Sequence, residues 1–205
     1  LMKKLIIFDL DGVIIDSKEN MRVSWNAVNK SLNLKISFKR YFDKIGMPFE
    51  DILKKLRINR MFFKKAKKIF RKNSIKNFNL IKIYPETHEI ISKLKKNPAY
   101  KLAVLTSKEK TRTIKILKRF NLKFHYVQCP IKGKKGKPDP YLLNNLLRKS
   151  KVKKSNCCYL GDTSIDLRFS KNSKINFIFC NYGYGKIKNK NIKTIKKLSQ
   201  IFKFI

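Results

Sequence analysis

Short apolar runs alternate with amphipathic stretches along most of this 205-residue chain. The apolar runs are rich in β-branched residues and predict strands at Lys4–Phe8, Lys101–Leu105, Phe124–Gln128, Cys157–Leu160 and Ile175–Cys180. The amphipathic stretches predict helices at about Pro85–Lys96, Lys108–Phe120, Pro140–Lys149 and Ser164–Ser170, with a last one near Ile195–Phe202. Strands and helices that alternate in this way are typical of a parallel sheet covered by helices. We therefore predict an α/β fold with a Rossmann-like sheet.

The alternation is interrupted once, between residues 17 and 83. This segment shows no convincing strand pattern, and its periodicity predicts only helices, at Asn20–Ser31, Phe49–Leu56 and Asn59–Lys72. Pro85 marks the return to the α/β pattern. We therefore predict an α/β core made of residues 1–16 and 84–205, with a helical insert at residues 17–83 after the first strand.

Hydrophobic residues make up 42% of the chain, which favours a globular protein. The apolar run near the N-terminus is only four residues long and ends at Asp9, so we interpret it as a buried strand and not as a signal peptide. No segment approaches the roughly 20 apolar residues of a membrane span. The four cysteines have no metal-binding spacing and are interpreted as free thiols. We expect a soluble cytoplasmic protein with no membrane partner.

Basic residues greatly outnumber acidic ones, with 51 Lys and Arg against 13 Asp and Glu and a formal charge of +38. Such a charge predicts nonspecific, salt-sensitive attraction to nucleic acids and other polyanions. The lysines are spread through every predicted element, and Asn and Ile are abundant beside them. We therefore interpret the charge as a compositional bias and not as a specific nucleic-acid site.

Carboxylates gather where two of the predicted strands end. Asp9 and Asp11 follow the first strand, and Asp162 and Asp166 follow the fourth. An open α/β sheet binds its ligands at the carboxyl ends of its strands. If these two strands are neighbours, the four carboxylates converge in one crevice, where their mutual repulsion requires a cation. Ligation by oxygen alone favours Mg²⁺ over zinc.

Four ordered motifs resemble those of the haloacid dehalogenase superfamily, and in particular its phosphoglycolate phosphatase and β-phosphoglucomutase branch. The motifs are Asp9-Leu10-Asp11-Gly12-Val13, Leu105-Thr106-Ser107, Gly136-Lys137-Pro138-Asp139-Pro140 and Gly161-Asp162-Thr163-Ser164-Ile165-Asp166. The helical insert between the first two is similar to the small helical cap of this family. The resemblance spans residues 4 to about 185 and implies a phosphoric monoester hydrolase that uses Mg²⁺.

The resemblance also implies roles for the strand-end carboxylates. Asp9 would attack phosphorus and form an aspartyl phosphate, while Asp11 would protonate the leaving alcohol and later activate water. Gly12 would permit the tight turn that follows. Asp9, Asp162 and the backbone carbonyl of Asp11 would ligate Mg²⁺, with Asp166 holding a metal-bound water or orienting Lys137.

Further residues are assigned in the same way. Thr106 and the backbone N–H of Ser107 would bind the transferring phosphoryl group, and Lys137 would neutralise its charge. The cap would select the leaving group through a turn that contains Lys44 and Gly46. We expect a small phosphorylated metabolite as substrate, such as phosphoglycolate, a sugar phosphate or a nucleotide, and a monomeric or dimeric protein.

Two alternatives remain beside the phosphatase. A phosphosugar mutase of the β-phosphoglucomutase type would share the first motif, but that branch places a histidine near the start of the first cap helix, where this chain has Asn20 and Met21. It also tends to have a Glu-Asp pair where this chain has Gly161 and Asp162. A non-catalytic polyanion-binding protein would use the positive charge but would have no need of the complete set of aspartates.

Overall fold

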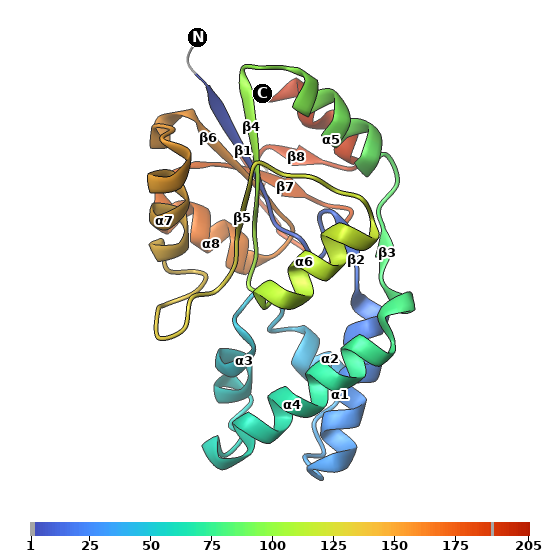
Figure 1. Ribbon diagram of the computed structural model, residues 1–205. Coiled ribbons are helices and arrows are strands. Elements are labelled where there is room, and N and C mark those ends of the chain that lie inside the picture. Colours follow the sequence, from blue (N-terminus) through green and yellow to red (C-terminus); the bar gives the residue numbers. More distant parts are fainter. Residues whose placement is uncertain (1–2, 190) are drawn as a thin grey trace.

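The computed structural model describes residues 3–189 and 191–205 (Figure 1). Residues 1, 2 and 190, which belong to the predicted core, lie outside the described residues. A sheet with helices on both faces forms the upper part of the view, and a group of helices lies below it, beyond the end of β1 (Figure 1).

The sheet has six parallel strands in the order β5-β4-β1-β6-β7-β8. The strands are β1 (Lys4–Phe8), β4 (Tyr100–Leu105), β5 (Tyr126–Gln128), β6 (Cys157–Gly161), β7 (Asn176–Cys180) and β8 (Thr194–Ile195). The predicted α/β class and its five strands are confirmed. The last predicted helix is wrong at its start, because Ile195 belongs to β8 and the helical turn is a 3-10 segment at Leu198–Lys203. Two residues are too few to show alternation, so β8 has no pattern in the sequence.

Side chains alternate between the two faces of the sheet and give it two separate hydrophobic layers. On one face Ile6 and Phe8 pack with helices α5 (Thr87–Lys96) and α6 (Lys110–Arg119). On the other face Leu5 and Ile7 pack with α7 (Tyr141–Ser150) and α8 (Ser164–Ser173). The central strand β1 is therefore buried on both sides, as its continuous apolar sequence requires.

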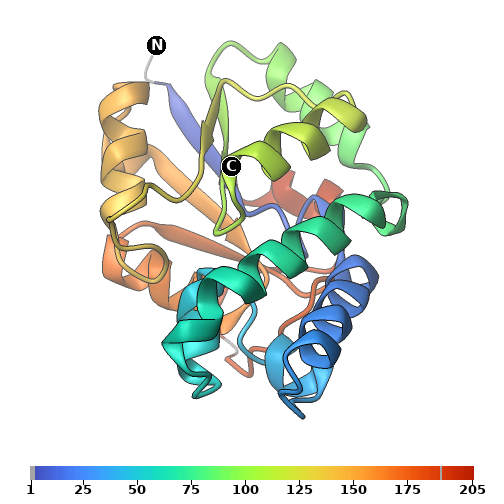
Figure 2. The same cartoon turned by 60° about the horizontal axis from the view of Figure 1, so that its bottom comes forward.

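The insert contains helices α1 (Lys18–Ser31), α2 (Phe38–Phe42), α3 (Phe49–Lys55) and α4 (Phe63–Lys76), with 3-10 turns at Arg60–Phe62 and Phe78–Leu80. Helices α1 and α4 pack side by side (Figure 2). These helices share a third hydrophobic cluster. At its centre Trp25 stacks on Tyr41 with ring centroids 4.5 Å apart, and its indole N–H donates to the carbonyl of Ile36 at 2.9 Å. Helix α2 has only five residues, which is too short for a periodic pattern.

A two-stranded antiparallel ribbon connects the insert to the core. It pairs β2 (Ile15–Asp16) with β3 (Lys82–Ile83), so that Ile15 lies opposite Ile83 and Asp16 opposite Lys82. The expectation of no strand up to residue 83 is therefore wrong at its end, because a two-residue strand carries no alternation to detect.

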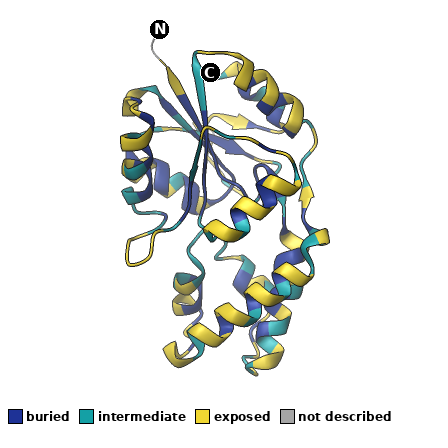
Figure 3. Cartoon of the chain, viewed as in Figure 1, coloured by how far each residue is buried: buried dark blue, intermediate teal, exposed yellow. Residues whose placement is uncertain are grey.

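Burial follows the layers. The strands of the sheet and the inward faces of its helices are buried, while the outer helical faces are exposed (Figure 3). The cysteines are free thiols, three buried and one partly buried. Among the described residues, no helix combines the length and the apolar character needed to cross a membrane.

The separate cluster of the insert predicts a separate contribution to stability. Leu53 is fully buried in it, so Leu53→Ala should lower the free energy of unfolding by about 2–5 kcal/mol. Met61→Ala is the matched control, because this side chain is 72% exposed. Trp25 is the only tryptophan, so its fluorescence during denaturant unfolding measures the effect within the insert. Equal losses in the two variants would contradict the assigned packing.

Candidate active site

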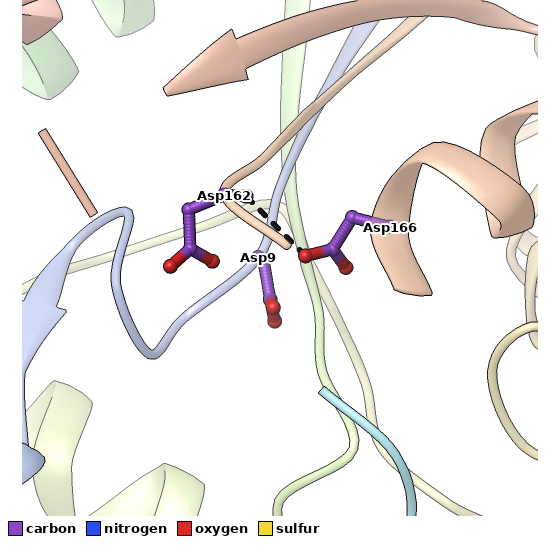
Figure 4. Close-up of side chains that lie close together, drawn as sticks. All are labelled: Asp9, Asp162 and Asp166. Carbon is purple, nitrogen blue, oxygen red and sulfur yellow. Dashed lines mark hydrogen bonds between the residues drawn. The ribbon is translucent and has the colours of Figure 1, made fainter. Parts of the chain in front are cut away.

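The predicted meeting of the first and fourth strands is present in the structure. Strands β1 and β6 are neighbours, and the N–H of Asp9 donates to the carbonyl of Leu160 at 2.8 Å. Asp9, Asp162 and Asp166 lie close together, each from a different segment (Figure 4). Each offers a carboxylate oxygen within 4.8 Å of the others. They form a buried acidic group at the carboxyl edge of the sheet.

Asp11 does not join this group with its side chain, so the expected convergence of four carboxylates holds for only three. Its Oδ2 lies 3.1 Å from Nζ of Lys108, and its Oδ1 accepts a hydrogen bond from the Ser17 hydroxyl. Lys108 precedes helix α6, and Ser17 is the residue before helix α1 of the insert. The Asp11 carboxylate therefore lies between the core and the insert.

Gly12 permits the tight turn that directly follows Asp11. Its φ is +80°, a left-handed conformation that favours glycine. A Cβ atom on Gly12 would lie 2.0 Å from Oδ2 of Asp162. Any side chain at this position would therefore displace Asp162 from the acidic group, as well as straining the backbone.

Lys137 is buried beside the acidic group and ties its members together. Its Nζ lies 2.9 Å from Oδ2 of Asp9 and 2.8 Å from Oδ1 of Asp166, and it donates to the hydroxyl of Tyr159 at 2.9 Å. The Tyr159 hydroxyl donates in turn to Oδ1 of Asp166 at 2.8 Å. Sequence reasoning missed Tyr159, because a tyrosine within an apolar strand looks like an ordinary core residue.

Asp166 is held by helix α8 itself. Its Oδ2 accepts from the hydroxyl and the N–H of Thr163, at 2.6 and 3.0 Å, in a capping box at the helix start. Burial alone would raise the pKa of Asp166, but Lys137 and the hydrogen bonds from Thr163 and Tyr159 bring it below its ordinary value. Asp166 therefore stays ionised and positions Lys137.

In the other two carboxylates, Asp9 and Asp162, burial and neighbouring negative charges disfavour the ionised form. Burial raises the pKa of Asp9 to about 7, against the opposing effect of Lys137 and with a further rise from Asp166 and Asp11. Burial, together with the charges of Asp166 and Asp9, raises the pKa of Asp162 well above its usual range. Oδ2 of Asp162 accepts from the N–H of Tyr184 at 2.7 Å, whereas its buried Oδ1 has no hydrogen-bond partner among the described residues.

This donor set fits a divalent cation. Three carboxylates and one lysine leave a formal charge of −2 in a buried space, and Oδ1 of Asp162 is an oxygen in need of a partner. Oxygen ligands of this kind suit Mg²⁺. Asp9 and Asp162 are the residues available to hold such an ion, because Asp166 is already engaged by Lys137, Thr163 and Tyr159.

Thr106 and Ser107 follow strand β4, next to the acidic group. The N–H of buried Thr106 donates to the carbonyl of Gln128 at 3.1 Å, and its hydroxyl accepts from the N–H of Lys108 at 3.2 Å. The hydroxyl of Ser107 donates to the carbonyl of Gly46 at 2.7 Å. The predicted phosphate-binding segment is thus in direct contact with the predicted contact turn of the insert.

That turn, which also contains partly buried Lys44, lies close against the core. Gly46 has φ +95°, and a Cβ atom there would lie 2.7 Å from the hydroxyl oxygen of Thr163. A Cβ atom on Gly136 would lie 2.6 Å from the ring of Pro48. The turn therefore touches the loops that carry Ser107, Lys137 and Asp162.

Tyr184 joins the acidic group, the connecting ribbon and the insert. Besides its N–H bond to Asp162, its hydroxyl accepts from the N–H of Ser17 at 2.6 Å and donates to Oδ1 of Asp16 at 3.1 Å. Its ring lies 5.1 Å from that of Phe42 in helix α2. The residue follows the last long strand and lies outside any periodic pattern.

Comparison with known proteins places this chain in a family. The sequence model of the haloacid dehalogenase-like hydrolases matches residues 6–180. A phosphoglycolate phosphatase of Aquifex aeolicus is 28% identical over 191 residues, which cover 90% of this chain and 87% of the relative. Pyrophosphatase PpaX of Halalkalibacterium halodurans is 27% identical over 174 residues, covering 83% and 80%.

Solved structures show the same fold. A haloacid dehalogenase-like hydrolase of Streptococcus pneumoniae aligns over 99% of both chains with a TM-score of 0.84 and 17% identity. A hydrolase of Pseudomonas syringae aligns over 89% of this chain and 87% of its own, with a TM-score of 0.80 and 24% identity. The chain belongs to the haloacid dehalogenase-like hydrolases. Its resemblance to the phosphoglycolate phosphatase branch is confirmed.

The raised pKa values predict how pH and a divalent cation act on stability. Between about pH 4 and pH 7 the folded protein keeps a proton on Asp9 that the unfolded chain has lost, so stability without metal falls as pH rises. A cation competes with that proton. The increase in melting temperature caused by Mg²⁺ should therefore be larger at pH 8 than at pH 5.5. The same increase at both pH values, or an unchanged response in Asp162→Asn, would contradict a metal site at this group.

Proposed function

We propose that this protein is a Mg²⁺-dependent phosphatase that hydrolyses a small phosphomonoester through an aspartyl phosphate on Asp9. The observation that carries the proposal is the buried carboxylate of Asp9, which lies 2.9 Å from Lys137 and beside Asp162 and Asp166. The prediction of a phosphoric monoester hydrolase is confirmed by the family match and by relatives named phosphatase and pyrophosphatase.

Asp9 is prepared for attack on phosphorus. Its Oδ1 accepts from the N–H of Leu10 at 2.7 Å and its Oδ2 faces Lys137, so the carboxylate is fixed in orientation and is removed from water. A carboxylate becomes a competent nucleophile when cations screen the charge of the phosphoryl group. Lys137 supplies one such charge, while Thr106 and the N–H of Ser107 would hold the phosphoryl oxygens from the neighbouring strand β4.

Asp11 is suited to proton transfer because its carboxylate lies apart from the acidic group. It faces the boundary between core and insert, where the leaving alcohol of a bound ester would lie once its phosphoryl group is at Asp9. There it would donate a proton to the leaving oxygen and then take one from the attacking water. Gly12 permits the left-handed turn that directly follows Asp11.

Bound Mg²⁺ would be held by Asp9, Asp162 and the backbone carbonyl of Asp11, and it would neutralise and orient the phosphoryl group. Tyr184 would keep Asp162 in place through its N–H. Asp166 would act indirectly, through Lys137.

Residues 17–83 would act as the cap that closes over the site and selects the substrate. Within the turn that contains Lys44 and Gly46, Gly46 contacts the loops that carry Ser107 and Thr163. Relatives named phosphoglycolate phosphatase and pyrophosphatase support a small substrate. A sugar phosphate and a nucleotide remain the other candidates.

The mutase alternative is less well supported at the cap. Its expected histidine position falls at Asn20 or Met21, and Asn20 has a structural use here. Its amide donates to the carbonyls of Ser74 and Asn77 at 3.0 and 2.8 Å, which ties helix α1 to the end of α4. Its side chain is therefore engaged within the cap. The polyanion-binding alternative gives no account of the buried acidic group.

The nucleophile is tested by Asp9→Asn. We expect Mg²⁺-dependent release of inorganic phosphate from a panel of small phosphomonoesters, with activity falling to background in the variant and with EDTA. Asp51→Asn is the matched control, because this aspartate lies on cap helix α3 and pairs with Lys54 across 3.0 Å. Activity that survives in Asp9→Asn would overturn the assignment, and transfer of phosphate within a sugar without its release would favour the mutase.

The cap contact is tested by Gly46→Ala. The new Cβ would meet Thr163, so the turn should no longer dock and kcat/KM should fall about 10- to 100-fold. Gly133→Ala is the control, because it has a similar φ of +73° but nothing within 4 Å of the added atom. Equal effects in the two variants would mean that backbone strain alone, and not cap docking, is responsible.

A further inference from the structure

Lys108 is a buried lysine that the proposed chemistry does not use. It follows Thr106 and Ser107, and its side chain is only 5% exposed. Its Nζ lies 3.1 Å from Oδ2 of Asp11. A lysine seldom stays buried unless its charge is paired, and burial lowers the pKa of Lys108 against the opposing effect of Asp11.

A second cation, Arg112, lies close to Lys108. It belongs to the first turn of α6 and reaches from the core into the cap, where it donates to the Ser74 hydroxyl at 2.5 Å. Its guanidinium also lies over the ring of Phe70, 5.5 Å from the centroid. Burial lowers the pKa of Arg112, and Arg112 in turn acts to lower that of Lys108. Both basic groups thus lie where the core meets the cap.

Counting charges divides the site into two regions of opposite sign. The acidic group with Lys137 has a formal charge of −2, which suits a divalent cation. Lys108, Arg112 and Asp11 together have a formal charge of +1. Glu109 does not alter this balance, because it pairs with Arg71 across 3.3 Å. Tyr41 is kept neutral by burial, which raises its pKa. The second region therefore has positive charge in excess.

We propose that Lys108 and Arg112 form a subsite for a second anionic group of the substrate, a carboxylate or a phosphate. This inference rests on the proposed phosphatase function. A salt bridge to Asp11 accounts for Lys108 alone, whereas an anion between core and cap accounts for both cations. Since Arg112 connects α6 with α4, the same anion would also stabilise the closed position of the cap.

The distances limit how far the second anion can be from the ester oxygen. Asp11 must be within about 2.6–3.2 Å of the leaving oxygen to transfer a proton. Lys108 is 3.1 Å from the same carboxylate. The anionic group therefore lies near the leaving oxygen, attached to it directly or through one or two carbon atoms. Uncharged leaving groups of the same length should be poorer substrates, and cationic ones poorer still.

The test compares substrates that differ only in this group. The ratio of kcat/KM for phosphoglycolate to that for ethyl phosphate measures the contribution of the carboxylate and cancels any general effect on Asp11. Lys108→Met and Arg112→Met should each lower this ratio about 30-fold, as expected when one partner of a buried charge pair is removed. Lys115→Met, an exposed position on the same helix, should leave it unchanged. For phosphoethanolamine, whose second group is a cation, the ratio of kcat/KM to that for ethyl phosphate should instead rise in Lys108→Met and Arg112→Met.

A second pair of substrates identifies the kind of anion. A fall in the ratio for pyrophosphate over ethyl phosphate, without one for phosphoglycolate, would assign the subsite to a phosphate, and the converse would assign it to a carboxylate. Unchanged ratios for both substrates in both variants would overturn the proposal. Arg112→Lys, which keeps the charge, should restore part of the lost ratio, so a folding defect in Lys108→Met does not leave the question open.

A binding experiment distinguishes failure of the proposed phosphatase function from failure of the anion subsite. Calorimetry of phosphoglycolate or pyrophosphate binding to Asp9→Asn needs no turnover, and adding Lys108→Met should weaken binding of the preferred anion about 30-fold. Binding that depends on Lys108 in a protein that hydrolyses nothing would support the subsite and refute the phosphatase. Hydrolysis with kcat/KM ratios that do not change in Lys108→Met or Arg112→Met would support the phosphatase and refute the subsite.

Discussion

Lys137 holds its positive charge where water does not reach it, and three segments of the chain arrange themselves around that charge. Burial alone would lower the pKa of this ammonium group, but Asp166 and Asp9 raise it above the ordinary lysine range, so the charge is retained. Removing one partner of a buried charge set is strongly destabilising, because the remaining charges are left unpaired. Strands β1 and β6, helix α8 and the loop before α7 must therefore keep their mutual positions for this lysine to remain buried.

This constraint explains why Asp9, the proposed nucleophile, can be buried at all. Asp9 shares its lysine with Asp166, and the helix-capping bonds of Asp166 fix the far side of the same network. Repulsion among the carboxylates is not removed by this arrangement but is concentrated on Asp9 and Asp162, the two that can bind a cation. The repulsion that remains therefore lies between the two carboxylates whose oxygens are available to a cation.

Much of this could be predicted from the sequence, because long elements leave long patterns. The five main strands and the order of the motifs were readable, and with them the positions of Asp9, Asp162 and Lys137. Strands β2, β3 and β8 have two residues each and leave no periodicity. Tyr159 was hidden among apolar neighbours, and Lys108 among many basic residues. The separate position of the Asp11 carboxylate depends on a local turn, which residue spacing alone does not determine.

The two-stranded ribbon has a consequence for how this architecture changes over evolutionary time. Because Ile15 pairs with Ile83, the chain leaves the core and returns to it at almost the same point. The whole intervening segment is therefore connected to the sheet in the same way as a long hairpin loop, whatever its internal size. Insertions are tolerated best where their two ends lie close together at a surface. Such a segment can be lengthened, rebuilt or exchanged without altering strand order. With the proposed role of the cap in substrate choice, substrate preference and reaction chemistry can then be selected almost independently.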